Sequence, residues 1–173
     1  MKSNWLWMLA WVLPLPAAAD LIGRVAEVNE GDALTVVVNG REQMRVRLLG
    51  IDAPESYQDF AGQAKSNLGA LVSGRDVRLA DVQKDRFGRT WARVWVSGAD
   101  CVQATCPQTV DVGLAQVAAG WAWHDPQQSK EWPSADRQRY SEAEFMAKVR
   151  RLGLWAGKSP VAPWAAKQHR LVE

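Results

Sequence analysis

The sequence predicts an α+β fold, mainly β with helices. Five segments are rich in β-branched residues or alternate apolar with polar residues, which is typical of β-strands. Three further segments repeat apolar residues at helical spacing. The chain has 173 residues, of which 47% are apolar and 23% are charged, so it has the size and composition of a single globular domain.

Three of the expected strands lie near the N-terminus, at residues 21–28, 34–38 and 44–51. Asn39-Gly40 separates the second of these strands from the third. Because both residues tolerate a positive φ, the pair predicts a tight hairpin turn. We expect this turn to set the register of the two strands that it joins.

The remaining strands and the helices follow later in the chain. Strands are expected at residues 75–83 and 90–96, on either side of the turn-like segment 84–89. Apolar periodicity and terminal glycines predict three helices, at residues 60–73, 110–119 and 134–152. Ser134 is expected to cap the last helix and Gly153 to end it.

The first residues have the features of an export signal. Lys2 precedes an uncharged, mostly apolar run that ends in Ala17-Ala18-Ala19. This run is shorter than the roughly 20 residues that span a bilayer, and prolines interrupt it, which disfavours the alternative of a membrane anchor. We therefore expect residues 1–19 to be a cleaved signal peptide. The mature protein would be secreted or periplasmic and would not associate with membranes.

Export also bears on the two cysteines, Cys101 and Cys106. In an oxidising compartment we expect them to form a disulfide, with two free thiols as the alternative. A zinc site is disfavoured because no second pair of cysteines or histidines stands at ligand spacing.

The domain is expected to span residues 20–157, and residues 158–173 to form a C-terminal tail. Pro160 and Pro163 argue against a helix in the tail, and Trp164 is costly to leave in water. We therefore expect an extended segment laid on the domain surface.

Five charged residues form an inventory suited to phosphodiester hydrolysis, which needs a cation on phosphate, a base for water and donors for charge at phosphorus. Asp32 and Asp52 offer the oxygen ligands that calcium prefers. Glu55 could activate water. Arg47 and Arg89 could each grip phosphate through paired donors. The strand end at Arg47 suits this chemistry, because the carboxylates of Asp52 and Glu55 follow just beyond it.

Each of these residues also has a simpler interpretation. Taken alone, the aspartates and the glutamate are turn caps or solvated carboxylates, and the arginines are surface ion-pair partners. The net charge of the chain does not distinguish these simpler roles from a functional site. Without residues 1–19 the chain carries twenty basic and nineteen acidic side chains, a net charge of +1, which predicts no partner by itself.

Three motifs occur in the order found in the staphylococcal nuclease-like (thermonuclease) family, and the chain resembles that family over residues 21–155. The family's Asp-Gly-Asp-Thr turn corresponds to Glu-Gly-Asp-Ala at residues 30–33. Its Arg-Leu-x-x-x-Asp-x-Pro-Glu motif corresponds to residues 47–55, and its Asp-x-Tyr-Gly-Arg motif to residues 85–89. The middle motif is the most specific of the three.

The resemblance implies a five-stranded OB-type barrel with three α-helices, and a phosphodiesterase of the thermonuclease-like endonuclease type that acts on DNA and RNA. It implies calcium (Ca2+) as the cofactor, with three ligating residues, Asp32, Asp52 and, through its backbone carbonyl, Ala53. It also implies Glu55 as the general base or water-orienting group. Arg47 and Arg89 would stabilise the transition state.

Three positions depart from the family's pattern. Glu30 replaces an aspartate, and Ala33 replaces a threonine whose hydroxyl would lie near the metal, which predicts weaker metal binding. Phe87 replaces a tyrosine, so its ring is kept and its hydroxyl is lost. The family's later nucleotide-stacking tyrosines are not matched here, and the aromatic candidates for stacking are Trp121, Trp123, His124 and Trp132.

The main alternative is a noncatalytic OB-type module that binds nucleic acids or oligosaccharides. A structural export-side domain with a relic site is a third interpretation. The carboxylates disfavour a binding module, because without a metal they would repel phosphate. We expect a monomeric nuclease, and the sequence leaves open its preference between DNA and RNA and between endo and exo cleavage.

Overall fold

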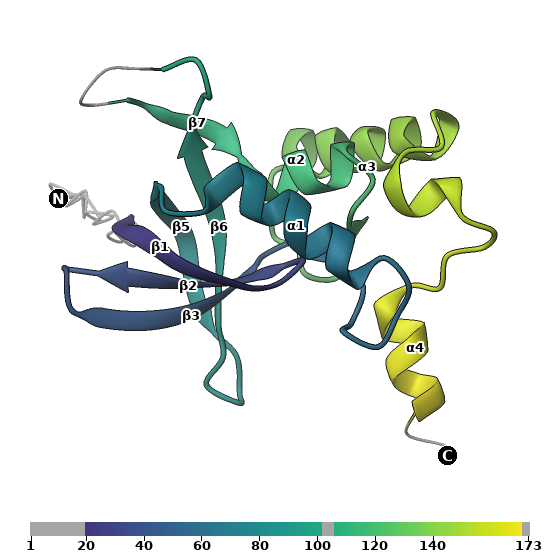
Figure 1. The fold of residues 1–173 in the computed structure, drawn as a ribbon, viewed down its shortest axis with the longest axis horizontal. Helices are drawn as coiled ribbons and strands as arrows, with labels where there is room; N and C mark the ends of the chain where they lie inside the picture. Colours follow the sequence, from purple (N-terminus) through teal and green to yellow (C-terminus); the bar gives the residue numbers. More distant parts are fainter. Residues whose placement is uncertain (1–19, 102–105, 171–173) are drawn as a thin grey trace, which may run out of the picture.

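The computed structural model describes residues 20–101 and 106–170, and the core of this part is a five-stranded barrel. Its strands are β1 (Leu21–Glu30), β2 (Ala33–Val38), β3 (Glu42–Leu48), β5 (Asp76–Lys84) and β6 (Thr90–Ser97). They are hydrogen-bonded in the order β3-β2-β1-β5-β6, and parallel pairing of β3 with β6 closes the sheet. The barrel lies on one side of the molecule and most of the helices on the other (Figure 1). The expected α+β fold with an OB-type barrel is confirmed.

The hairpin between β2 and β3 forms at Asn39-Gly40, as the sequence predicts. Both residues have a positive φ, 53° at Asn39 and 70° at Gly40. The backbone N–H of Arg41 donates to the carbonyl of Val38 at 3.2 Å, which closes the turn. Val38 pairs with Glu42, so the alternating residues of β2 and β3 point their apolar sides into the barrel.

The third expected strand is broken in two. The strand β3 ends at Leu48, and after a turn the chain forms β4 (Ile51–Asp52), which pairs with β8 (Trp123–His124). Gly50 makes this break possible. Its φ is 83°, and a Cβ added there would lie 2.2 Å from the ring of Trp132. The break directs the residues after Leu48 toward the helical side of the molecule.

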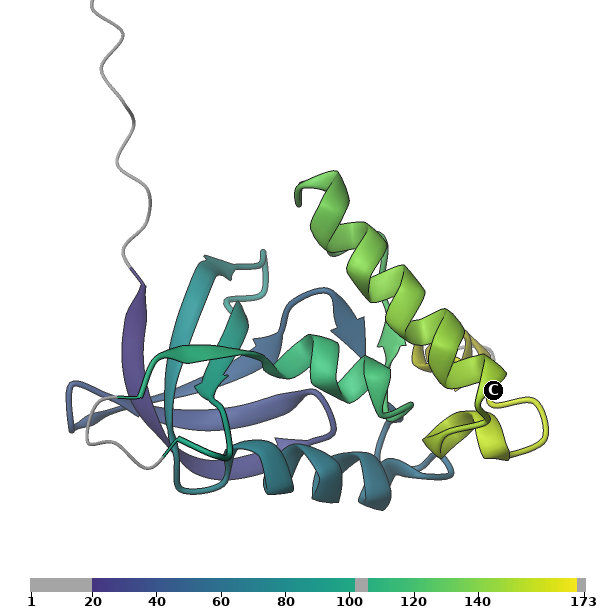
Figure 2. The same ribbon diagram turned by 90° about the horizontal axis from the view of Figure 1, so that it is seen from above.

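Three helices match the expected ones closely: α1 (Ala61–Val72), α2 (Val112–Ala118) and α3 (Ser134–Val149). Figure 2 shows α1 running beside the barrel and α3 running obliquely past the end of α2. A strand that sequence reasoning missed, β7 (Gln108–Asp111), pairs with β6 and leads directly into α2. Its last residue, Asp111, caps α2 by accepting a hydrogen bond from the backbone N–H of Leu114 at 3.2 Å.

Two expectations about α3 are wrong. Ser134 is the first helical residue, and the cap position belongs to Pro133, which makes no side-chain cap. The helix ends at Val149, and Gly153 instead begins the short helix η1 (Gly153–Ala156). Gly153 is needed for close approach, because an added Cβ would lie 2.4 Å from the carbonyl oxygen of Gly120.

The tail is not extended throughout, which corrects the expectation from its prolines. Residues 158–162 are non-helical, but Pro163 begins the helix α4 (Pro163–Arg170). Proline suits the first position of a helix, because the N–H that it lacks would have no partner there and its φ is already helical.

The predicted disulfide is present between Cys101 and Cys106, with their Cα atoms 6.0 Å apart. The predicted signal peptide lies outside the described residues, and the domain boundaries stay a prediction. Within residues 20–101 and 106–170, no helix is long and apolar enough to cross a membrane.

Candidate active site

Asp32 lies in the turn between β1 and β2, which is packed tightly against the helical side of the molecule. A Cβ on the neighbouring Gly31 would lie 2.7 Å from Cβ of Ala64 and 2.8 Å from Cβ of Ala53, so glycine is required there. The buried side chain of Gln116, on α2, donates to the carbonyl of Gly31 at 2.7 Å. Asp32 is only 3% exposed. The fold thus holds a carboxylate in a rigid and largely dry position.

Asp52 and Ala53 follow the break after β3 and lie next to this turn. The backbone N–H of Ala53 donates to the carboxylate of Asp32. Asp52 is 6% exposed. Burial, and then the negative charge of Asp32, raise the pKa of Asp52 to about 7. Burial also raises the pKa of Asp32. A nearby positive charge would stabilise the ionised forms of these two carboxylates.

Arg47 supplies part of that charge from β3. Its Nη1 donates to Oδ2 of Asp32 at 3.3 Å, and its Nη2 donates to Oε2 of Glu30 at 2.7 Å. Burial works against the guanidinium charge, but Asp32 and Glu30 outweigh it and raise the pKa of Arg47. Arg47 therefore stays charged and is aimed at the two carboxylates.

Glu55 lies in the loop between β4 and α1. Its backbone N–H donates to Oε1 of Gln58 at 3.0 Å, which orders the loop. Its side chain is partly exposed, at 19%, and lies close enough to Arg47 and Asp32 to influence the pKa of each. The structure therefore brings together four of the five charged residues that the sequence predicts for the site.

Arg89 is near this cluster but not in ionic contact with it. Its Nε pairs with Oδ2 of Asp85 at 2.5 Å, at the end of the β5–β6 turn. Burial raises the pKa of Asp85, but hydrogen bonds led by those from Arg89 outweigh burial and lower it to about 2. The ring of Trp91 links the two arginines, since its centroid lies 5.9 Å from Cζ of Arg47 and 5.7 Å from Cζ of Arg89.

Sequence reasoning missed one residue of the cluster. Lys167, on α4, places its Nζ 2.8 Å from Oε1 of Glu55 and 3.4 Å from Oδ2 of Asp52. It comes from the tail, outside every motif that drew attention to the site. Its position depends on how the tail docks, and no local sequence signal encodes that.

Asp32 and Asp52 are oxygen donors of the kind that hard cations such as calcium prefer. In the part of the chain that the structure describes, no three acidic, histidine or cysteine side chains form a group that could hold a metal. A cation at Asp32 and Asp52 would therefore take further oxygens from a backbone carbonyl, from water or from substrate phosphate. Both carboxylates are buried hard-oxygen donors, and Asp52 pairs with a lysine ammonium as its counter-ion.

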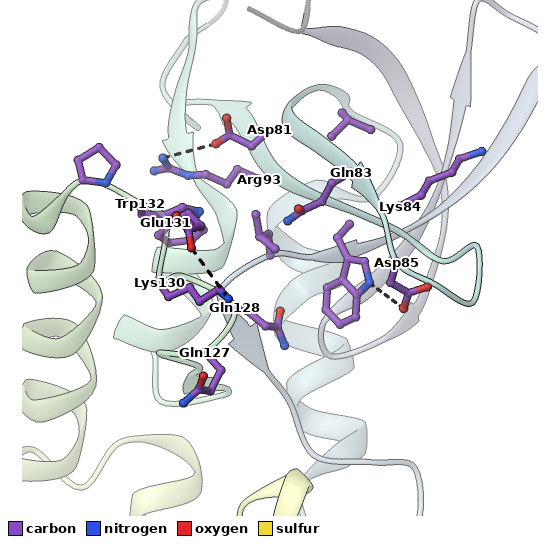
Figure 3. Close-up of a pocket in the computed structure, with 14 residues that line it drawn as sticks. Asp81, Gln83, Lys84, Asp85, Arg93, Gln127, Gln128, Lys130, Glu131 and Trp132 are labelled. Carbon is purple, nitrogen blue, oxygen red and sulfur yellow. Dashed lines mark hydrogen bonds and ion pairs between the residues drawn. The ribbon is translucent and has the colours of Figure 1, made fainter.

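A cleft of about 600 Å³ lies between the β5–β6 turn and the loop before α3, and Trp91 is the lining residue whose ring also lies near Arg47 and Arg89. Figure 3 shows Lys84 and Asp85 on one wall and Gln127, Gln128 and Lys130 on the other. Trp91 contributes its ring to the cleft and donates from Nε1 to Asp85 at 3.3 Å. Polar side chains facing an aromatic ring in an open cleft are suited to nucleotides.

The structure places the aromatic candidates for stacking in different environments. Trp123 and His124 are buried, so neither presents a ring for stacking. Trp121 is half-buried and packs against Phe60, outside this cleft. Trp132 lines the cleft but is only 8% exposed. Trp91, which lies within the strand expected at residues 90–96, is the half-buried ring beside the charged cluster.

An OB-type barrel that gathers buried carboxylates with arginines, two of which, Arg47 and Arg89, line an open cleft, has the features of an enzyme acting on phosphodiesters. Comparisons with known proteins agree with this class. A family model described as staphylococcal nuclease homologue matches residues 45–157. The chain belongs to the staphylococcal nuclease family.

Individual relatives cover most of the chain. It is 36% identical over 155 residues to a micrococcal nuclease of Shigella flexneri, covering 88% of this chain and 84% of the relative. It is 35% identical over 153 residues to Protein ParB of Escherichia coli, covering 88% and 82%. An uncharacterized endonuclease of Haemophilus influenzae is 35% identical over 140 residues, covering 81% and 69%. Family membership supports a nuclease, that is, a phosphodiesterase that acts on nucleic acids.

Proposed function

We propose that this protein is an exported, calcium-dependent nuclease that hydrolyses phosphodiester bonds of DNA and RNA. The observation that supports it most strongly is the cluster of four residues from separate segments, Asp32, Arg47, Asp52 and Glu55. A structural role alone does not explain two buried carboxylates side by side, because burying like charges destabilises a fold.

Asp32 and Asp52, with the backbone carbonyl of Ala53, would hold the calcium ion. When bound, calcium neutralises the phosphate oxygens and so favours attack at phosphorus. Calcium suits this set better than magnesium does, because calcium accepts irregular oxygen cages of mixed carboxylate, carbonyl and water ligands. Two carboxylates are few for such a site, so we expect weak binding, on the order of 10⁻⁴ to 10⁻³ M.

Glu55 is the proposed base. It lies at the edge of the carboxylate pair and is partly exposed, so it can reach a water molecule on the substrate side. It would accept a proton from that water as the water attacks phosphorus. Arg47 would donate to the phosphate oxygens from one side, and Arg89 from across the ring of Trp91.

The cleft is proposed to hold the nucleotides next to the scissile phosphate. Lys130 can approach the phosphate backbone, and the half-buried ring of Trp91 can contact a base or sugar. These contacts involve groups that DNA and RNA share, which supports activity on both polymers.

The test is an assay of the mature chain on DNA and RNA, with calcium or with a chelator. We expect hydrolysis of both polymers with calcium and loss of hydrolysis with the chelator. Arg47→Ala should lower the rate by about 10²-fold or more. Arg41→Ala is the matched control, because Arg41 is an exposed residue in the turn just before β3, far along the strand from Arg47, and should leave the rate unchanged. Hydrolysis that survives the chelator would refute the calcium requirement, and inactivity under both conditions would refute the activity.

A further inference from the structure

The C-terminal tail lies outside residues 45–157, which the family model matches, yet it is attached to the domain. Nε2 of Gln58 donates to the carbonyl of Val161 at 2.9 Å. The ring of Trp164 packs edge-on against the ring of Trp123, with 6.5 Å between their centroids. Gln58 lies in the loop that carries Glu55, so the tail docks on the loop that forms one side of the site.

A third attachment reaches into the site itself. The ammonium of Lys167 bridges the carboxylates of Glu55 and Asp52, at 2.8 Å and 3.4 Å. These carboxylates are largely buried, while the lysine side chain is 45% exposed. The lysine therefore enters from solvent to meet charges that belong to the domain.

This contact and the proposed chemistry exclude each other. A divalent cation at Asp32 and Asp52 would repel an ammonium group that sits on Asp52. The same ammonium also pairs with Glu55 and occupies an oxygen that a base needs for water. With Lys167 in place, its ammonium group takes up one oxygen of Asp52 and one of Glu55.

We propose that residues 158–170 form an autoinhibitory strap, in which Lys167 competes with calcium for the site. This inference rests on the proposed function. Calcium binding and docking of the strap are then thermodynamically coupled, and each weakens the other by the same factor. The enzyme would stay closed at low calcium and open where calcium is abundant.

The direct test is the calcium dissociation constant of the full mature chain, measured by isothermal titration calorimetry without nucleic acid. Lys167→Met removes the charge and keeps the length of the side chain. Because a partly exposed ion pair contributes modestly, we expect calcium to bind about threefold to tenfold more tightly to this variant. Lys167→Arg keeps the charge and should stay within about twofold of the wild type.

Lys158→Met is the matched control for the loss of one positive charge from the tail. Lys158 is exposed and, among the described residues, makes no hydrogen bond or ion pair. This variant should bind calcium as the wild type does. If Lys158→Met tightens binding as much as Lys167→Met, the effect is general electrostatics and the strap is refuted.

A second variant loosens the strap without touching its charge. Trp164→Ala removes the ring that packs on Trp123, and it should tighten calcium binding in the same direction as Lys167→Met. Hydrogen exchange gives an independent readout. The amides of α4 should lose protection when calcium is added to the wild type, and unchanged or increased protection would overturn the proposal.

The outcomes distinguish a failure of the strap from a failure of the proposed function. If the wild type and Lys167→Met bind calcium equally and both cleave nucleic acid, the strap is wrong and the proposed function stands. If neither binds calcium, the metal site and the strap fail together. Tighter binding by Lys167→Met and Trp164→Ala, with both lysine controls unchanged, establishes the strap.

Discussion

Burying the carboxylates of the site carries an electrostatic cost that nearby positive charges reduce. Asp32 and Asp52 are almost inaccessible to water, and burial raises the pKa of each. Arg47 neutralises Asp32, and the tail lysine neutralises Asp52. Removing Arg47 would be costly, because it would leave the charge of the buried Asp32 unpaired. The electrostatics of the site are therefore tuned to cations.

Glu55→Gln tests whether Glu55 acts in the chemical step and not in nucleotide binding. Removing the base should lower turnover by roughly 10²-fold or more and leave nucleotide affinity nearly intact, since a base acts only as water loses its proton. Turnover and affinity are measured on one oligonucleotide at saturating calcium. Glu27→Gln, at an exposed position on β1, is the matched control and should behave as the wild type. Undiminished turnover in Glu55→Gln would remove Glu55 from the mechanism.

At the scale of elements, buried polar networks join the barrel to the helices that complete the site. Arg93 of β6 pairs with Asp111 at 3.1 Å and with Asp136 of α3 at 2.9 Å. The hydroxyl of Tyr140 donates to Asp111 at 2.7 Å. Because Asp111 also caps α2, its carboxylate links β6, the N-terminus of α2 and α3. This network sets how α2, which carries Gln116, sits against the turn of Asp32.

A second network holds β8, the partner of β4. His124 is buried, with Nε2 at 2.9 Å from Oγ of Ser129 and Nδ1 at 3.3 Å from Oγ of Ser141. Burial lowers the pKa of His124, while Glu144 and Asp125 partly oppose this. The folded protein thus favours the neutral imidazole.

This network predicts a pH dependence of stability. Below the ordinary histidine pKa of about 6.5 the unfolded chain binds a proton that the folded chain resists, so the contribution of His124 to stability falls as the pH drops from 7 to 5.5. The slope from one group is at most about 1.4 kcal/mol per pH unit. His124→Gln should lose less stability over this range, as measured by urea unfolding. Asp52 titrates here with the opposite sign, but it does so in both proteins. Identical pH dependence in the two would contradict the account.

For the whole molecule, the parts that local chemistry determines could be predicted from the sequence. The Asn39-Gly40 turn and α1 depend on neighbouring residues, and so does the alternation of β2 and β3. The pairing of β4 with β8 could not be predicted, because two-residue strands carry almost no pattern and depend on distant partners. Pro163 was misread as a helix breaker, although proline is common at the first helical position.

The site was predictable to the same extent. Motif spacing identified the charged residues, and the fold brings four of them together because the turn of Asp32 packs against the segment after β3. Spacing did not reveal that Trp91 lies between two guanidinium groups or that Lys167 reaches Asp52. Both depend on segments that meet only in three dimensions.

The central claim is that Asp32 and Asp52 bind the calcium ion on which hydrolysis depends. Its most direct test is the rate of DNA hydrolysis by the wild type and by Asp52→Asn, measured across a range of calcium concentrations. The account predicts that the variant needs about tenfold or more calcium to reach half of its maximal rate, because a neutral amide is a weaker ligand for calcium than a carboxylate. Superimposable calcium curves for the two proteins would contradict it.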